Sequence, residues 1–266
     1  MSGLTVWVQG VGLLGPGLSS WASAREVLRG TQPRVAAPTV LPAPARLPAA
    51  ERRRAGAAVK LALAVADEAV AHARVDPRTL ATVFTSSSGE GMNCHALCET
   101  LATPTPMVSP TRFTNSVHNA ASGSWHIAVG SRAASTSLCA FDGSFGAGLI
   151  EAATSVASSR EPLLLVASDS PYPEPLNTAR PLPDHFGLAL LLAPFANEHS
   201  IAALTIAAVD PQHVATVCVD LGLETLRRAI PAAAALPLLI ALAQRPARQT
   251  VVLDFLATMR LQIDLP

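Results

Sequence analysis

The chain has 266 residues, of which 50% are hydrophobic and 14% charged, and its formal net charge is zero. This much apolar material is enough for a large buried core and excludes an intrinsically disordered chain. The neutral balance gives no reason to expect a nucleic acid or an anionic membrane as partner.

No stretch has the length of a membrane span or the pattern of an export signal. The longest apolar run, residues 229–243, is too short to cross a bilayer and contains two prolines. The N-terminal residues lack a basic region and an apolar core of signal length. We therefore expect a cytoplasmic protein with reduced cysteines. Cys94 and Cys98 lack a second ligand pair, so we expect no metal and no other cofactor.

The first part of the chain predicts strands and helices separated by proline-rich loops. Residues 5–8 predict a strand, followed by a turn through Gly10, Gly12 and Gly15. These glycines resemble a phosphate-binding loop, but no acidic residue follows at the required distance. Apolar spacing then predicts one long helix over residues 52–73, and Arg52, Arg53 and Arg54 lie at its start.

Residues 115–151 contain the feature on which the functional interpretation depends. They predict a short helix, a buried strand at residues 136–141, a tight turn at residues 142–144, and an apolar helix. A strand that ends in a sharp turn and opens a helix is how many α/β enzymes hold a nucleophile. Here Asp142 stands on the turn, where we expect it to cap the following helix. Cys139, inside the predicted strand, is expected to be a small buried hydrophobe.

The last part of the chain predicts further strands around one helix. Residues 162–167 form an all-apolar strand, typical of a sheet covered on both faces. Residues 186–192 and 201–209 are expected to pair as a hairpin. Residues 214–221 predict a strand or short helix, residues 226–242 a helix, and residues 251–265 an edge or antiparallel pair.

The segment from residue 111 to residue 151 resembles the N-terminal half of a β-ketoacyl synthase of the thiolase-like superfamily. Asn119, Gly123, Gly130 and Arg132 fall at matching spacing, and residues 135–141 match the strand before the nucleophile. The match extends over about residues 4–210. It implies an α/β, layered αβα fold in which the first half, residues 1–210, is largely complete. Residues 211–266 would be a short remnant of the second half, packed on the same domain.

The resemblance also implies that the active site is vacated. Counting from Asn119 places the nucleophilic cysteine of the family at Asp142, or at Gly143 after a slip of one residue. Neither residue can form a thiolate, and the two catalytic histidines are missing from the matching motifs. The chain thus resembles a chain-length factor, most closely the short form of aryl polyene and xanthomonadin-type pigment pathways.

A chain-length factor pairs with an active β-ketoacyl synthase in a heterodimer that is served by an acyl carrier protein. Carried onto this chain, residues 135–141 would pair with the equivalent strand of the partner, and residues 110–119 would lie beside its active site. The helix from Gly91 would run along the interface. The residues this assigns to the interface are Pro110, Phe113, Asn119, Ser135, Ser137, Cys139 and Phe141, and those that would limit the acyl tunnel are Met92, His95 and Ala96.

Two other functions remain open from the sequence. A small acyltransferase or hydrolase would use Cys139 or Ser144, although the motif around Ser144 misses the usual last glycine spacing. A scaffold that docks an acidic acyl carrier protein would use two arginine clusters, residues 52–54 and 227–228.

Overall fold

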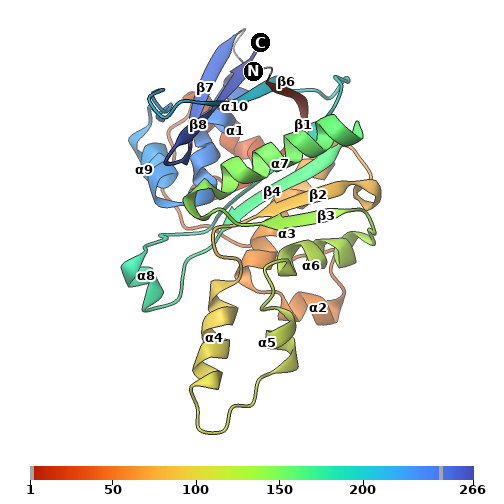
Figure 1. Ribbon diagram of the computed structural model, residues 1–266, viewed down its shortest axis with the longest axis vertical. Coiled ribbons are helices and arrows are strands. Elements are labelled where there is room, and N and C mark those ends of the chain that lie inside the picture. Colours follow the sequence, from red (N-terminus) through yellow and green to blue (C-terminus); the bar gives the residue numbers. More distant parts are fainter. Residues whose placement is uncertain (1–2, 246–247) are drawn as a thin grey trace.

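One mixed β-sheet includes every strand of the described residues, from β1 to β8. The computed structural model describes residues 3–245 and 248–266, and in these the sheet has eight strands in the order β3-β2-β4-β5-β1-β6-β8-β7 (Figure 1). The strands are β1 (Leu4–Leu14), β2 (Ala81–Thr85), β3 (Ser135–Leu138), β4 (Leu163–Asp169), β5 (Phe186–Ala193), β6 (Ala202–Val209), β7 (Gln249–Leu256) and β8 (Met259–Leu265). β3, β2 and β4 run parallel, and the remaining neighbours are antiparallel.

Helices cover both faces of this sheet. The α-helices are α1 (Trp21–Arg29), α2 (Ala49–Arg54), α3 (Ala57–Ala73), α4 (Gly91–Leu101), α5 (Pro110–Thr114), α6 (Ala120–Val129), α7 (Ser144–Ser159), α8 (Leu176–Ala179), α9 (Leu221–Ala229) and α10 (Leu236–Gln244), with short 3-10 turns η1 (Pro77–Thr79), η2 (Phe141–Gly143) and η3 (Pro231–Ala235). Alternate residues of β4 serve opposite layers. Leu164 and Val166 join the core with α3, while Leu163 and Leu165 join the core with α7. The layered αβα fold implied by the resemblance is confirmed.

Glycines let α3 pack directly on the middle of the sheet. Gly10 and Gly12 lie within β1 rather than in the turn predicted after Val8. A Cβ atom added at Gly12 would lie 2.0 Å from the carbonyl oxygen of Val65, and one at Gly10 would lie 2.3 Å from that of Ala69. The glycine-rich motif is therefore a close contact between a strand and a helix, not a phosphate-binding loop.

β1 also explains why one predicted hairpin is wrong. Its first half pairs with β6 and its second half with β5, so β1 lies between these two strands. A run of alternating residues predicts a strand but does not identify its neighbour. Residues 214–220 form neither the strand nor the short helix predicted over residues 214–221, and α9 begins only at Leu221. Thr216 instead donates its N–H to the carbonyl of Val252 at 2.8 Å, which covers part of the β7 edge.

The predicted helix over residues 52–73 is interrupted at its start. α2 ends at Arg54 and α3 begins at Ala57, so the three arginines lie at the C-terminal end of a helix. Cations are favourable there because the helix dipole is negative at that end. Glu90 supplies the negative charge at the start of α3, where the Ala58 N–H donates to its carboxylate at 3.2 Å. Burial raises the pKa of Glu90 above its usual value.

Helices α4 and α5 form an arm that projects away from the sheet (Figure 1). No residue of either helix is buried. Asn93 of α4 donates to the carbonyl of Arg112 in α5 at 2.8 Å, which ties the two helices together. A helix pair with no buried face of its own gains little stability from packing.

The start of α9 carries an ion-pair cluster that makes stability depend on pH. Glu224 accepts from Arg227 at 2.8 Å and from Arg228 at 2.6 Å, and these partners lower its pKa to about 2. Because the pKa is lower in the folded state, the stabilisation is present above the unfolded pKa and is lost as pH falls from about 4.5 toward 2.

We therefore expect the melting temperature to fall on acidification below about pH 4.5, and to fall less steeply in Glu224→Gln. Thermal unfolding followed by circular dichroism between pH 3 and pH 7 measures this. Glu161→Gln, at an exposed position, is the control and should keep the wild-type slope. Equal slopes for the wild type and Glu224→Gln would contradict the assignment.

No helix in the described residues is both long and apolar enough to span a membrane. Within the same residues, no group of three or more His, Cys, Asp or Glu side chains is arranged to hold a metal ion.

Candidate functional site

The free edge of β3 is the first component of the candidate site. β3 pairs only with β2 within the described sheet. The carbonyls of Ala134 and Leu138 accept from β2 and the residue after it, at 3.0 and 3.4 Å. Because backbone polar groups alternate in direction along a strand, those of Ser135 and Ser137 point away from β2. Such an edge is a template for a strand from another chain.

Helix α6 holds this edge in place through hydroxyl groups. The Ser122 hydroxyl donates to the carbonyl of Asn119 at 3.0 Å and lies 3.1 Å from the Ser137 hydroxyl. Thr82 of β2 donates to the Ser135 hydroxyl at 2.8 Å. Three residues predicted for the interface, Asn119, Ser135 and Ser137, are thus connected to one edge of the sheet.

The turn after β3 begins earlier in the chain than predicted. The strand ends at Leu138 rather than at residue 141, and the residue with a left-handed backbone is Phe141, with φ of 52°. This conformation is strained for a residue with a side chain. The apex of the strand–turn–helix motif is therefore Phe141, one residue before the predicted Asp142. Which residue occupies the apex depends on the backbone dihedral angles of the turn, and counting residues along the sequence does not reveal these angles.

Ser144 fixes this turn, and its hydroxyl both accepts and donates a hydrogen bond within it. Its hydroxyl accepts from the Ala140 N–H at 3.0 Å and donates to the Phe141 carbonyl at 2.7 Å. The residue is only 2% exposed. A hydroxyl that is buried and bonded in both directions is poorly placed to attack a substrate, which weighs against a Ser144 hydrolase.

Asp142 does not cap helix α7. The helix begins after Gly143 without a side-chain cap. The Asp142 carboxylate instead forms an ion pair with Arg180, whose guanidinium lies 3.5 Å from the ring centroid of Phe141 and 5.6 Å from that of Tyr172. Arg180 thus binds the apex residue Phe141 and its neighbour Asp142, because a guanidinium combines a charge with a flat face that stacks on aromatic rings.

Cys139 is exposed rather than buried, and it directly follows an edge strand in which no residue is buried. Its thiol donates to the carbonyl of Ser87 at 3.1 Å. Among the described residues, no His or carboxylate side chain is hydrogen-bonded to this sulfur. A nucleophilic thiol would need such a group as the base that activates it.

A buried carboxylate connects the turn region to the second half of the chain. Asp169, at the end of β4, is 2% exposed and accepts from the Ser87 N–H at 2.8 Å and the Ser87 hydroxyl at 2.7 Å. Its other oxygen accepts from the Ala232 N–H at 2.8 Å. Burial raises its pKa. Since Ser87 also accepts from Cys139, this network ties the end of β3 to η3.

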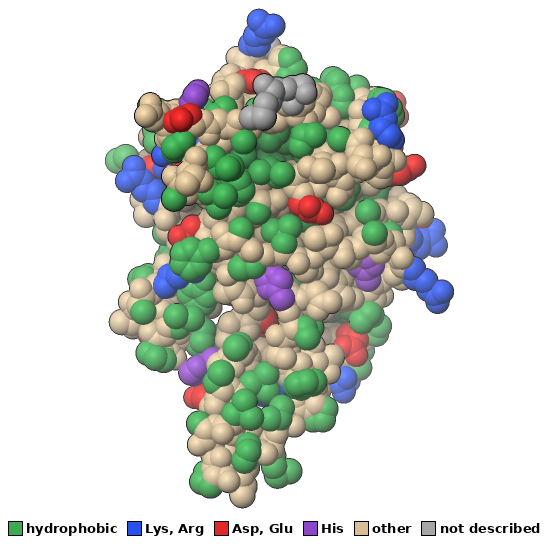
Figure 2. Space-filling view, in the orientation of Figure 1, with side chains coloured by type: hydrophobic (Ala, Val, Ile, Leu, Met, Phe, Trp, Pro, Cys, Tyr) green, Lys and Arg blue, Asp and Glu red, His purple; other side chains and the backbone are tan. Residues whose placement is uncertain are grey.

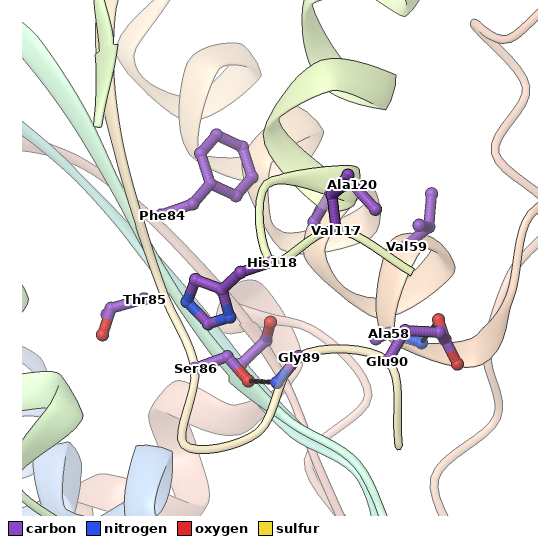
Figure 3. Close-up of a pocket in the computed structure, with 12 residues that line it drawn as sticks. Ala58, Val59, Phe84, Thr85, Ser86, Gly89, Glu90, Val117, His118 and Ala120 are labelled. Carbon is purple, nitrogen blue, oxygen red and sulfur yellow. Dashed lines mark hydrogen bonds between the residues drawn. The ribbon is translucent and has the colours of Figure 1, made fainter. Parts of the chain in front are cut away.

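The predicted tunnel-limiting residues line one groove on the arm side of the molecule. Met92, His95 and Ala96 of α4 border a groove of about 550 Å³ between α4, α5 and the start of α3. Val59 and Glu90 border both this groove and a smaller cavity of about 30 Å³. Figure 3 shows this cavity, with Phe84, Ser86 and His118 around it.

Exposed apolar side chains extend from this groove over the arm. Figure 2 shows hydrophobic side chains gathered on the projecting lobe and few charges at its tip. The exposed fraction is 68% for Phe113 and 87% for Met107. The large apolar residues exposed on the arm and the loop after it are Met92, Leu101, Met107, Phe113 and Val117. Pro110 begins α5 within this surface.

Sequence reasoning missed three residues that organise the site. Arg180 lies in a proline-rich loop, where no periodicity indicates a contact with the turn. The role of Glu90 at the start of α3 could not be predicted, because that helix was expected to begin at residue 52. Asp169 offered one usable signal, since a carboxylate that ends an all-apolar strand is buried and needs partners.

Comparisons with known proteins place this geometry in a family. A family model described as the N-terminal domain of β-ketoacyl synthase matches residues 21–237. None of the curated proteins matches the chain.

Solved structures share the fold. A structure of the ketosynthase ApeO in complex with its chain length factor ApeC, from Xenorhabdus doucetiae, is 22% identical with a TM-score of 0.73, and the match covers 98% of this chain and 99% of that one. The ishigamide ketosynthase/chain length factor is 15% identical with a TM-score of 0.71 and the same coverage. A type II polyketide synthase ketosynthase in complex with its acyl-carrier protein, AntDE:AntF, is 12% identical with a TM-score of 0.75, again with 98% and 99% covered.

Proposed function

The chain belongs to the β-ketoacyl synthase family, and on that basis we propose that it is a non-catalytic chain-length factor. In this role it pairs with an active ketosynthase and shapes the tunnel that receives the growing acyl chain. The observation that carries the proposal is the combination of a free β3 edge with an apex that has no nucleophile.

The chemistry of condensation supports a non-catalytic role. A ketosynthase needs a thiolate to carry the acyl chain and further groups to stabilise the developing enolate oxygen. In this chain the apex residue is Phe141, and Arg180 stacks on its ring. The nearby Cys139 has its thiol directed at the Ser87 carbonyl. The reacting groups must then come from the partner.

The groove on the arm supports the proposed role in shaping the tunnel. The face formed by Met92, His95 and Ala96 is open on this chain alone, and a ketosynthase packed on the β3 edge and the arm would cover it. The enclosed groove would receive the far end of the acyl chain, so its depth would set the product length.

We expect Ala96→Phe to shorten the product by at least one two-carbon unit, since the larger side chain would fill part of the groove. Mass spectrometry of products from the reconstituted complex measures this. Cys98→Phe is the matched control, because Cys98 lies on α4 but outside the groove, and it should give wild-type products. Unchanged products from Ala96→Phe in an intact complex would overturn the tunnel assignment.

The carrier-protein scaffold is the weaker alternative. Arg227, one of its predicted contacts, has a side chain that is 9% exposed and paired with Glu224 and Asp254. It is not available to an acidic partner, although Arg228 remains exposed. We propose that an acyl carrier protein visits the complex through the ketosynthase instead.

The proposed pathway rests on the resemblance of the sequence to pigment-type chain-length factors. We propose an aryl polyene or xanthomonadin-type pathway that works in the cytoplasm. Deletion of the gene should remove the visible absorbance of such a pigment, and a plasmid copy should restore it.

Co-expression with the cognate ketosynthase tests the pairing. We expect the two chains to co-purify and to elute together as a complex of one copy each. A well-folded monomer that shows no association with the ketosynthase would overturn the proposal.

A further inference from the structure

Phe141 combines three properties that bear on a role at an interface. It is a bulky residue with a left-handed backbone, its side chain is 59% exposed, and it stands three positions after the last residue of the free edge strand. Strain of this kind persists only where the surrounding structure enforces it, and it often marks a functional position. Burial of this ring against another molecule would remove apolar surface from water.

The surroundings of Phe141 hold its ring in a fixed position. Its carbonyl accepts from the Ser144 hydroxyl, which fixes the backbone of the turn. One side of its ring is covered by the Arg180 guanidinium, and that guanidinium is itself held by Asp142. Arg180 follows α8 directly and donates its backbone N–H to the Leu176 carbonyl at 2.9 Å. The part of the ring that Arg180 does not cover remains open.

We propose that Phe141 is an aromatic anchor that the partner ketosynthase takes up in an apolar pocket beside the strand it pairs with β3. Arg180 is the positioning residue that holds the anchor ready. This inference rests on the proposed function, because the occupant is the same ketosynthase. The observation that supports it is that Phe141 follows the free edge strand β3 closely in the chain, so a partner strand paired with β3 would end beside its ring. Rigid aromatic anchors carry much of the binding energy at protein interfaces because little side-chain freedom is lost on binding.

Substitution by glycine separates an anchor from a residue that merely shapes the turn. Glycine adopts a positive φ without strain, so Phe141→Gly preserves or relieves the backbone while removing the ring. If the residue served only the turn, this variant would pair with the ketosynthase at least as well as the wild type. An anchor predicts the opposite result.

The chain contains a matched control for the loss of an exposed aromatic ring. Phe195 is 56% exposed and lies under Arg160, with 4.4 Å from the guanidinium to the ring centroid. It follows β5, whose end pairs with the first residue of β4, and so it lies at the end of the sheet opposite to Phe141. Phe195→Ala should leave the pairing unchanged.

A competition experiment tests the inference without requiring the free chain to be soluble. The wild-type chain and a variant are co-expressed in equal amounts with limiting tagged ketosynthase, and the ratio in the purified complex is measured by intact mass. We expect at least about a tenfold excess of wild type over Phe141→Gly, a smaller excess over Arg180→Ala, and equal amounts for Phe195→Ala.

Equal incorporation of Phe141→Gly would overturn the anchor, and equal incorporation of Arg180→Ala would overturn the positioning role. In either case the wild-type chain is still recovered with the ketosynthase, so the proposed function stands. If the wild-type chain itself is not recovered, the proposed function fails and the inference fails with it.

Discussion

Replacing Ser137 with proline is expected to abolish the heterodimer and leave the fold of this chain intact. The N–H of Ser137 points away from β2, so proline removes a donor from the free edge while the bonds from β2 to Ala134 and Leu138 remain. Strand pairing across the interface loses a hydrogen bond and gains a clash, and we expect affinity to fall by at least about 100-fold. Co-purification with tagged ketosynthase measures the effect.

Ser137→Ala is the control for the lost hydroxyl. It removes the contact with Ser122 at 3.1 Å but keeps the backbone donor, so the complex should survive with a stability cost of about 1 kcal/mol. If Ser137→Pro keeps full pairing while its circular dichroism spectrum is native, β3 does not form the interface.

Gly12→Ala is expected to destabilise the fold strongly, although it adds a single methyl group. The new Cβ would lie 2.0 Å from the Val65 carbonyl oxygen, which belongs to the backbone of α3 and cannot rotate away. α3 would have to move off β1 in the centre of the sheet, and overpacking of this severity costs about 3 kcal/mol or more. That is a large part of the about 5–15 kcal/mol by which domains are stable. Soluble yield and thermal unfolding report the loss.

Gly123→Ala makes the same chemical change where there is room. No atom lies within 4 Å of a Cβ built at Gly123, and the residue is inside helix α6. Alanine favours a helix over glycine by up to about 1 kcal/mol, so this variant should be as stable as the wild type or more so. A native melting temperature for Gly12→Ala would refute the close packing of α3 on β1.

The fold was largely predictable because its strongest patterns are periodic. The apolar run of β4 indicated a strand covered on both faces, and the 3.6-residue spacing within the helix predicted over residues 52–73 indicated α3. Strand neighbours were not predictable from the same patterns. β1 pairs with strands that follow it by more than 170 residues, and nothing local in the sequence encodes such a contact.

The site was predictable as a region but not residue by residue. Order and spacing along the chain located the turn between β3 and α7, because the loop glycines and the following apolar helix are visible in the sequence. The apex at Phe141 was not visible, since its left-handed backbone is imposed by Ser144 and Arg180. A contact such as that of Arg180 with Phe141 depends on tertiary structure, and a proline-rich loop gives no periodic signal for it.

The location of the acyl group in the working complex tests the central claim most directly. The purified complex of this chain with its ketosynthase is incubated with an acyl-thioester donor, and each subunit is weighed by intact mass spectrometry. We predict an acyl adduct on the ketosynthase alone, with this chain present in equal amount and unmodified. An adduct on this chain that disappears in Cys139→Ala would contradict the account, because it would make this subunit a catalyst.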